Sequence, residues 1–222
     1  MKLFWDDPYR TTLTTDVATV DGQWVGLKET IFYAFSGGQE SDAGTIAGYA
    51  VLEARKKRLD IEYRLDANHA LSPGTAVQVE IDWERRYQLM RLHFAAELIL
   101  ELVYQRLSGI EKIGAHISAD KARLDFLWPQ NISTHFPALL ADARQLILEN
   151  RPIISAYSDR EKQRRYWEID GFSRVPCGGT HLRRTGEVGD IRLKRNNIGG
   201  GKERIEVFVS GSVDDLSLIQ KD

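Results

Sequence analysis

The chain has 222 residues, of which 42% are apolar and 28% charged, an ordinary balance for a globular domain. A formal net charge of −2 argues against general adhesion to polyanions, and no run approaches the roughly 18 apolar residues of a membrane span. The single cysteine forms no internal disulfide and suits a reducing compartment, and no signal-peptide core opens the sequence, so we expect a cytoplasmic protein without membrane contact.

The first 82 residues predict β structure. Segments rich in Thr, Val and aromatic residues are separated by turn signals such as Asp21-Gly22. The expected strands cover residues 11–20, 24–33, 45–53, 59–65 and 76–82. Several short strands without an intervening helix favour a small β-barrel-like domain over residues 1–82.

A long amphipathic helix is predicted over residues 83–107, where apolar residues recur three and four apart without Gly or Pro. His93 and Glu97 interrupt the apolar row of this helix. Because they are four residues apart, they project from one face with Cβ atoms about 5–6 Å apart, a spacing that can hold one metal ion. A buried polar pair of this kind needs partners.

The remaining elements predict a second domain over residues 83–222. A hairpin is expected over residues 112–128, a helix over 134–149, a strand near 153–157, and further strands after His181. Helices grouped against a largely antiparallel sheet make this part α+β, and the whole chain is therefore assigned to the α+β class.

The segment Cys177-Gly-Gly-Thr-His181 carries the only cysteine, four positions before a histidine. A thiolate and an imidazole are both good zinc ligands, and the two glycines let the backbone fold tightly enough for both to reach one ion. One such pair is half a site, and the helical pair His93 and Glu97 offers the best candidates for the other half. The alternative is a thiol nucleophile, which requires a histidine base and an orienting partner.

Taken together, the helical metal-binding spacing and the later Cys-x-x-x-His resemble the editing domain of alanyl-tRNA synthetase. The resemblance is stronger to that domain's stand-alone relatives, the alanyl-tRNA editing proteins. Four segments carry the resemblance in the family's order: the glycine-rich motif at residues 30–44, an Arg-x-Asp-Phe strand at 121–126, the second metal motif at 176–189 and the following segment at 198–206.

The chain departs from the family pattern at two places. Glu97 stands where the family usually has its second histidine, and Ser36 and Glu40 replace a glycine and the proline of the first motif. The resemblance implies a zinc ion held by His93, Cys177 and His181. Glu97 is then a fourth ligand, which we favour slightly, a general base, or a structural residue of a site that has lost its metal.

The activity that the resemblance implies is hydrolysis, in trans, of seryl or glycyl esters at the 3′ end of mischarged alanine tRNA, without aminoacylation. The alternative is a degenerate homologue that keeps the fold and RNA binding but does not hydrolyse. The oligomeric state does not follow from the sequence. The residues implied at the substrate are Thr30, Gly37, Gly38, Gln39 and His116, and those implied at the RNA are Lys202 and Arg204. Thr30 and Glu97 are also the candidates for catalytic residues. For His116 and Thr30 an ordinary structural role stays open.

Overall fold

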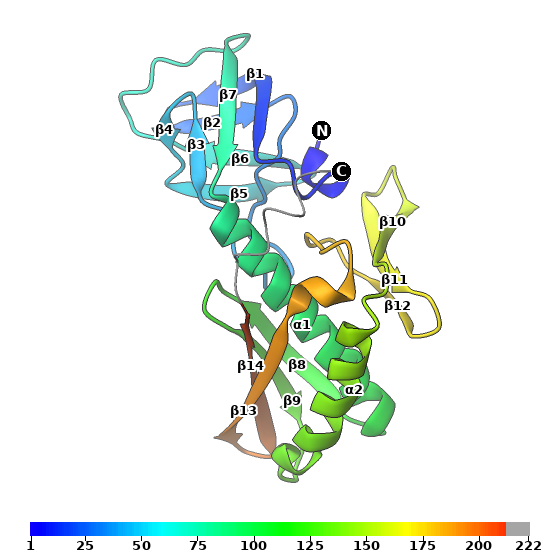
Figure 1. Cartoon of the computed structure of the whole chain (residues 1–222). Coiled ribbons are helices and arrows are strands. Elements are labelled where there is room, and N and C mark those ends of the chain that lie inside the picture. Colours follow the sequence, from blue (N-terminus) through cyan, green and yellow to red (C-terminus); the bar gives the residue numbers. More distant parts are fainter. Residues whose placement is uncertain (212–222) are drawn as a thin grey trace.

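The computed structural model describes residues 1–211, and helix α1 (Trp83–Arg106) connects a β-rich part to an α+β part (Figure 1). In the β-rich part, a short 3₁₀ helix, η1 (Leu3–Trp5), precedes a curled sheet. The strands of this sheet are β1 (Thr12–Asp21), β2 (Trp24–Leu27), β3 (Gly44–Ile46), β4 (Tyr49–Ala50), β5 (Glu53–Lys57), β6 (Asp60–Arg64) and β7 (Ala76–Ile81). All neighbours pair antiparallel, in the order β4-β3-β7-β1-β2-β6-β5.

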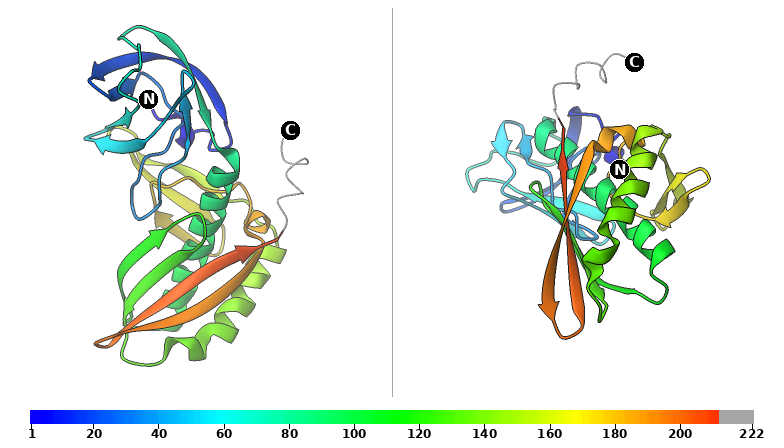
Figure 2. Two further views of the ribbon diagram at one scale, coloured as in Figure 1. Left: turned by 90° about the vertical axis from the view of Figure 1, so that its left-hand side faces the viewer. Right: turned by 60° about the horizontal axis from the view of Figure 1, so that its bottom comes forward.

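The second part is built on a four-stranded antiparallel sheet in the order β13-β14-β9-β8. Helices α1 and α2 (Phe136–Leu148) cover one face of it (Figure 2). The strands are β8 (Glu111–Ile117), β9 (Ala122–Leu127), β13 (Asp190–Gly199) and β14 (Lys202–Ser210). A separate three-stranded sheet contains β10 (Ile154–Asp159), β11 (Arg164–Ile169) and β12 (Ser173–Pro176), and two 3₁₀ turns complete the part, η2 (Ile132–His135) and η3 (Thr185–Val188). The predicted α+β class is confirmed.

Helix α1 begins and ends within one residue of its predicted bounds. Asp82 caps its N-terminus by accepting a hydrogen bond from the Arg85 backbone N–H at 3.0 Å, which satisfies one of the free donors of the first turn. The helix is buried along most of its length because helix α2 and the four-stranded sheet pack against it, while Arg86 in its first turn contacts the β-rich part. Within residues 1–211, neither α1 nor any shorter helix combines the length and apolarity that crossing a bilayer requires.

Two predicted strands differ from the structure. The strand expected at residues 24–33 ends early, although residues 31–33 are still buried. Their backbone is irregular because the N-terminal segment pairs with it, and the Leu3 N–H donates to the Thr30 carbonyl at 2.8 Å. The strand expected at residues 45–53 is instead a β3–β4 hairpin followed by β5, because Ala47 and Gly48 have positive φ angles and form a turn.

The strands β11 and β12 were not predicted. In β11, Arg165, Trp167 and Ile169 alternate as buried residues, so the period-two pattern of a strand is present. One of the three inward positions is an arginine, and the segment follows a run of charged residues, which hid the pattern.

The buried apolar residues form two clusters. The first runs from Phe4 to Ile81 and fills the curled sheet, and the second runs from Tyr87 to Val207 and lies between α1, α2 and the four-stranded sheet. Because the clusters divide at the start of α1, they support our proposal of domains at residues 1–82 and 83–222.

A buried ion pair joins the two clusters. Arg86 of α1 and Asp42 both have fully buried side chains, and the Arg86 guanidinium donates to both Asp42 oxygens. It also donates to the carbonyls of Pro8 at 2.8 Å and Ile31 at 2.6 Å. Asp42 in turn accepts the Tyr33 backbone N–H at 2.6 Å. The network ties α1 to the loop that follows β2.

We expect Asp42→Ala to lower the free energy of unfolding by about 3–5 kcal/mol, because it leaves the Arg86 guanidinium buried without a counter-charge. The matched control is Asp16→Ala, which breaks an exposed pair with Lys28 and should cost at most about 1 kcal/mol. Urea denaturation of both variants measures the difference. Similar small losses for the two variants would contradict the structural role of the buried pair.

Candidate metal centre

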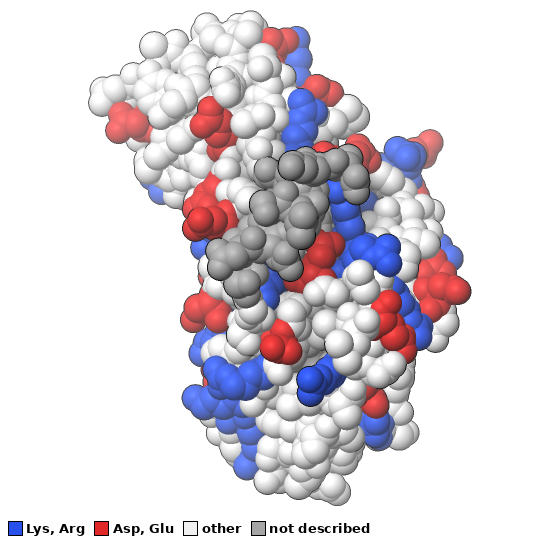
Figure 3. All heavy atoms as spheres, in the orientation of Figure 1, with Lys and Arg blue, Asp and Glu red and all other residues white. Residues whose placement is uncertain are grey.

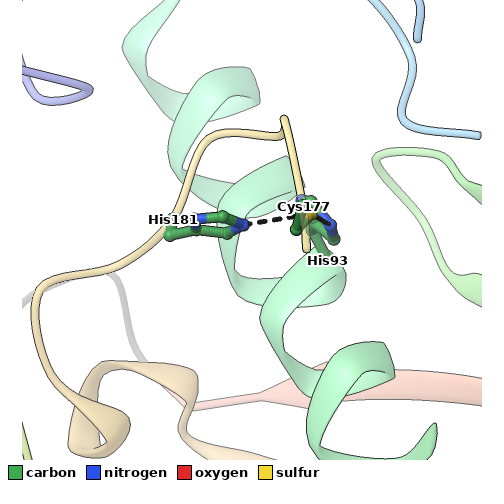
Figure 4. A group of neighbouring side chains, drawn as sticks. All are labelled: His93, Cys177 and His181. Carbon is green, nitrogen blue, oxygen red and sulfur yellow. Dashed lines mark hydrogen bonds between the residues drawn. The ribbon is translucent and has the colours of Figure 1, made fainter. Parts of the chain in front are cut away.

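Three side chains from distant parts of the chain meet beside the middle of α1 (Figure 4). His93 projects from α1, and Cys177 and His181 lie in the loop that follows β12. The Cys177 sulfur lies 3.4 Å from His93 Nε2 and 3.3 Å from His181 Nε2. The three candidate ligand atoms all lie within 4.8 Å of one another. The structure thus brings together the helix and the Cys-x-x-x-His segment, as the sequence predicts.

The neighbouring strands fix the orientation of this loop. The Cys177 backbone N–H donates to the Arg165 carbonyl of β11 at 2.9 Å, so the β11–β12 hairpin holds the cysteine in its position at the site. The Nδ1 atom of His181 is hydrogen-bonded to the Ser155 hydroxyl of β10 at 2.9 Å, which directs Nε2 toward Cys177. A partner on the second ring nitrogen is the usual way in which proteins orient a metal-binding histidine. Sequence reasoning missed Ser155 because no local motif marks it.

The separations fit a zinc ion. With Zn–N bonds of about 2.0–2.1 Å and Zn–S bonds of about 2.3 Å at tetrahedral angles, nitrogen and sulfur ligands lie about 3.5 Å apart. The observed N···S distances of 3.4 and 3.3 Å agree with this value. Two imidazoles and one thiol are also donors that zinc prefers. The chemistry and the spacing of the three side chains are therefore compatible with a zinc ion.

Glu97 lies at the edge of this group. Its Oε1 atom is 3.3 Å from His93 Nε2 and 3.7 Å from the Cys177 sulfur, and its Oε2 atom accepts the Trp167 indole N–H at 3.2 Å. It contacts two of the three candidate ligands and is not part of the group whose atoms all lie within 4.8 Å. Trp167, which holds the carboxylate in place, was not predicted because β11 was missed.

The charges around His93 favour a cation at this position. Burial by itself lowers the pKa of His93, but the Cys177 sulfur and the Glu97 carboxylate outweigh it and raise the pKa to about 10. Burial likewise works against ionised Glu97, yet the hydrogen bond and charge of His93 lower its pKa to about 2. The pKa of His181 falls well below its usual value through burial and the neighbouring positive charge. The surroundings thus favour a positive charge at His93 and a neutral His181. Because only a neutral imidazole binds a metal, an ion would replace the proton of His93.

The glycine-rich loop contacts the metal-binding loop directly. Buried Gln39 donates through Nε2 to the Thr180 hydroxyl at 2.9 Å and accepts the Thr180 backbone N–H at 3.3 Å. The Ile117 N–H of β8 donates to the Gly38 carbonyl at 2.8 Å, so the loop lies along that strand. Gly38 has a φ of +91°, and a Cβ there would lie 2.8 Å from the Ala115 carbonyl oxygen. Only glycine fits this approach.

The other predicted substrate residues lie farther from the candidate ligands. His116 is half-exposed, with Nε2 3.2 Å from Glu40 Oε1, at the outer side of the glycine-rich loop. Gly37 is in the same turn with a φ of +62°. Thr30 is buried in the first cluster, where its hydroxyl lies 2.6 Å from the Tyr63 hydroxyl. The structure therefore groups Gln39 with the metal-binding loop and places Thr30 within the curled sheet.

The two predicted RNA-binding residues lie on β14, next to the glycine turn at the opposite end of the molecule from the β-rich part (Figure 1). Arg204 donates to both oxygens of Asp125, at 2.6 and 3.0 Å, so its charge is already compensated. Lys202 is exposed and has no carboxylate partner in residues 1–211. On the face shown in Figure 3, Lys and Arg side chains lie among Asp and Glu side chains without forming one continuous basic field.

Comparison with known proteins agrees with the fold and the site. Residues 165–206 match the profile of the threonyl and alanyl tRNA synthetase second additional domain. The chain is 31% identical over 212 residues to the alanyl-tRNA editing protein AlaX-M of Pyrococcus horikoshii, covering 94% of this chain and 97% of that protein. It is 30% identical to the AlaX-M of Methanosarcina barkeri, and 34% identical to the alanine–tRNA ligase of Methanopyrus kandleri, of which it spans only 26%.

The profile match puts the chain in the class of proteins that carry the second additional domain of threonyl and alanyl tRNA synthetases. Within that class, the near full-length match shows that the chain belongs to the alanyl-tRNA editing protein family. The resemblance inferred from the four sequence motifs is confirmed.

The two glycines of the metal-binding loop should differ in their tolerance of a side chain. A Cβ at Gly179 would lie 1.9 Å from His93 Cε1 and 2.8 Å from Gln39 Oε1, whereas a Cβ at Gly178 meets nothing within 4 Å. We expect Gly179→Ala to cost about 1–3 kcal/mol of stability through overpacking, and Gly178→Ala to cost much less. Thermal melting of both variants measures this, and equal losses would show that the loop moves freely away from α1.

Proposed function

We propose that the protein is a zinc-dependent hydrolase that removes serine or glycine, attached in error, from the 3′ end of alanine tRNA. The observation that carries the proposal is the His93–Cys177–His181 group, with ligand separations that suit zinc, in a chain that aligns over 94% of its length with an alanyl-tRNA editing protein. The proposed cleavage occurs in trans: a separate synthetase charges the tRNA, and this chain then hydrolyses the ester.

Each part of the site has a proposed task. His93, Cys177 and His181 would hold the ion as its protein ligands. Bound zinc supplies Lewis acidity to the ester carbonyl and to the attacking water. Ser155 keeps Nε2 of His181 directed at the site through its contact with Nδ1, at 2.9 Å. Gln39 holds the metal-binding loop against the glycine-rich loop, whose Gly37 and Gly38 let the substrate approach the backbone.

Glu97 is proposed as the proton acceptor. Its Oε2 atom is held by Trp167 while Oε1 faces the group, so the carboxylate can take a proton from the attacking water at Oε1. Its contact with two of the three candidate ligands, rather than all, supports this role over that of a fourth ligand. Of the two proposed RNA contacts, Lys202 offers an uncompensated ammonium group, and Arg204 would act from within its pair with Asp125.

The purified protein should carry about one zinc ion per chain, and Glu97→Gln should keep it while lowering deacylation of seryl-tRNA by a factor on the order of 10²–10⁴. The reason is that Gln keeps the shape and the Trp167 contact but accepts no proton. Elemental analysis and a deacylation assay are the measurements. Zinc loss in Glu97→Gln would make the residue a ligand, and full activity in Glu97→Ala would exclude both roles.

Thr30 is proposed to recognise the serine hydroxyl, and its contact with Tyr63 allows a controlled test. Thr30→Val and Tyr63→Phe each remove the same hydrogen bond of 2.6 Å, but only the first removes the threonine hydroxyl. We expect Thr30→Val to lower the ratio of seryl to alanyl ester hydrolysis and Tyr63→Phe to preserve it. The reason is that a site that hydrogen-bonds a substrate hydroxyl discriminates against substrates that lack this hydroxyl. Equal ratios in both variants would leave Thr30 with a structural role alone.

A further inference from the structure

Two lysines without an acidic partner approach the metal-binding loop from different sides. The first is Lys2, which is only 7% exposed. Its ammonium group donates to Gln163 Oε1, in the turn between β10 and β11, at 2.6 Å and lies 4.5 Å from the Trp5 ring centre. The Trp5 indole N–H donates to the Gly178 carbonyl at 2.8 Å. Lys2 is therefore separated from the metal-binding loop by one side chain.

The second lysine, Lys56, reaches the same loop through the glycine-rich turn. Its ammonium group donates to the Ser36 hydroxyl at 2.8 Å. Ser36 and Gln39 exchange backbone hydrogen bonds of 3.2 and 3.1 Å, and Gln39 holds Thr180. Ser36 replaces a glycine of the motif that this segment resembles, and a glycine would offer no hydroxyl to Lys56.

The charges of the two lysines are not compensated. Neither forms an ion pair with a carboxylate in the part of the chain that the structure describes. Burial, followed by the positive charge of Lys56, lowers the pKa of Lys2 to about 8, while Asp60 acts in the opposite direction. Burial also lowers the pKa of Lys56. An anion at each ammonium group would favour its charged form.

A groove of about 730 Å³ opens beside Lys56. Phe35 lines it with a ring that is 52% exposed and lies 6.3 Å from the His116 ring. The other charged side chains that line it all have partners: Glu40 with Arg85, Asp42 with Arg86, Glu53 with Arg64, and Arg55 with Glu62. Lys56 is therefore the one uncompensated charge on the described lining of this groove, and it stands beside an exposed aromatic ring.

We propose that Lys2 and Lys56 each hold a backbone phosphate of the unpaired 3′ end of an RNA, and that Phe35 stacks on a base beside Lys56. The inference rests on the proposed function and deepens it by naming the residues that guide the acceptor end to the metal centre. Proteins bind unpaired nucleotides by combining cations along the backbone with aromatic platforms for the bases. Phosphate is an anion that an uncompensated ammonium group suits, and RNA supplies it next to a stackable base.

The first test measures binding of an uncharged RNA hairpin with a single-stranded 3′ end of four nucleotides, as a function of salt. Each phosphate contact on a single strand contributes about 0.7 to the slope of log K against log salt concentration. The double variant Lys2→Gln/Lys56→Gln should therefore lower the slope by about 1.4, and the exposed Lys56→Gln alone by about 0.7. Lys2→Arg/Lys56→Arg should restore it.

Lys112→Gln is the matched control, because Lys112 is exposed on β8 and also has no carboxylate partner in residues 1–211. It changes the net charge by as much as Lys56→Gln alone and should leave the slope unchanged. Phe35→Ala should weaken binding of the same RNA roughly fivefold or more, the worth of one stacked base, without weakening a blunt-ended hairpin. An unchanged slope in the double variant, or equal losses for blunt and single-stranded ends, would overturn the proposal.

The second test separates this proposal from the proposed function. Seryl-RNA carries backbone phosphates, whereas the seryl ester of adenosine carries none. At 0.15 M salt the double variant should lower kcat/KM for seryl-RNA roughly tenfold, as expected for two phosphate contacts, and leave hydrolysis of seryl-adenosine unchanged. Equal losses on both esters would overturn the lysine contact. If the parent protein hydrolyses neither ester, the proposed function fails, while the salt dependence with uncharged RNA still decides the contact.

Discussion

The position of the candidate metal centre depends on the buried pair between Arg86 and Asp42. Arg86 lies seven residues, or about two turns, before His93 on α1, and Asp42 lies three residues after Gln39. Gln39 then holds Thr180, next to His181. These contacts connect the helix to the glycine-rich loop and the glycine-rich loop to the metal-binding loop, which in turn lies beside the helix. The buried ion pair thus links the helix that carries His93 to the glycine-rich loop that contacts Thr180, while strands β10 and β11 orient His181 and Cys177.

The electrostatics of the centre follow from the same enclosure. A buried carboxylate beside a thiol is costly without a cation, and although burial lowers the pKa of His93, the Cys177 sulfur and the Glu97 carboxylate raise it to about 10. A zinc ion held by His93, Cys177 and His181 would compensate the same negative charge. Glu97 adds to the negative charge beside the three candidate ligands and so favours a cation there.

Features of this arrangement that have a local cause in the sequence could be predicted, and features that depend on distant contacts could not. The helix carrying His93 was predicted within one residue, because its apolar periodicity and the Asp82 cap are local signals. The pairing of the Cys-x-x-x-His segment with that helix followed from ligand chemistry and from the family motifs. The irregular backbone at Thr30 could not be predicted, because it depends on hydrogen bonds from the N-terminal segment, and the roles of Trp167 and Ser155 depend on a sheet that the sequence concealed.

In the glycine-rich loop, the residues that differ from the motif it resembles lie on the outer face of the loop. Gln39 and Asp42, whose side chains point into the molecule, keep the family pattern and make the contacts described above. Ser36 and Glu40, which replace a glycine and a proline, have side chains that point outward. The Ser36 hydroxyl accepts a hydrogen bond from Lys56, and Glu40 forms an ion pair with Arg85. The loop therefore keeps its inner contacts fixed while its outer face acquires polar groups that a glycine and a proline cannot provide. This outer face borders the groove beside Lys56, which Glu40 also lines.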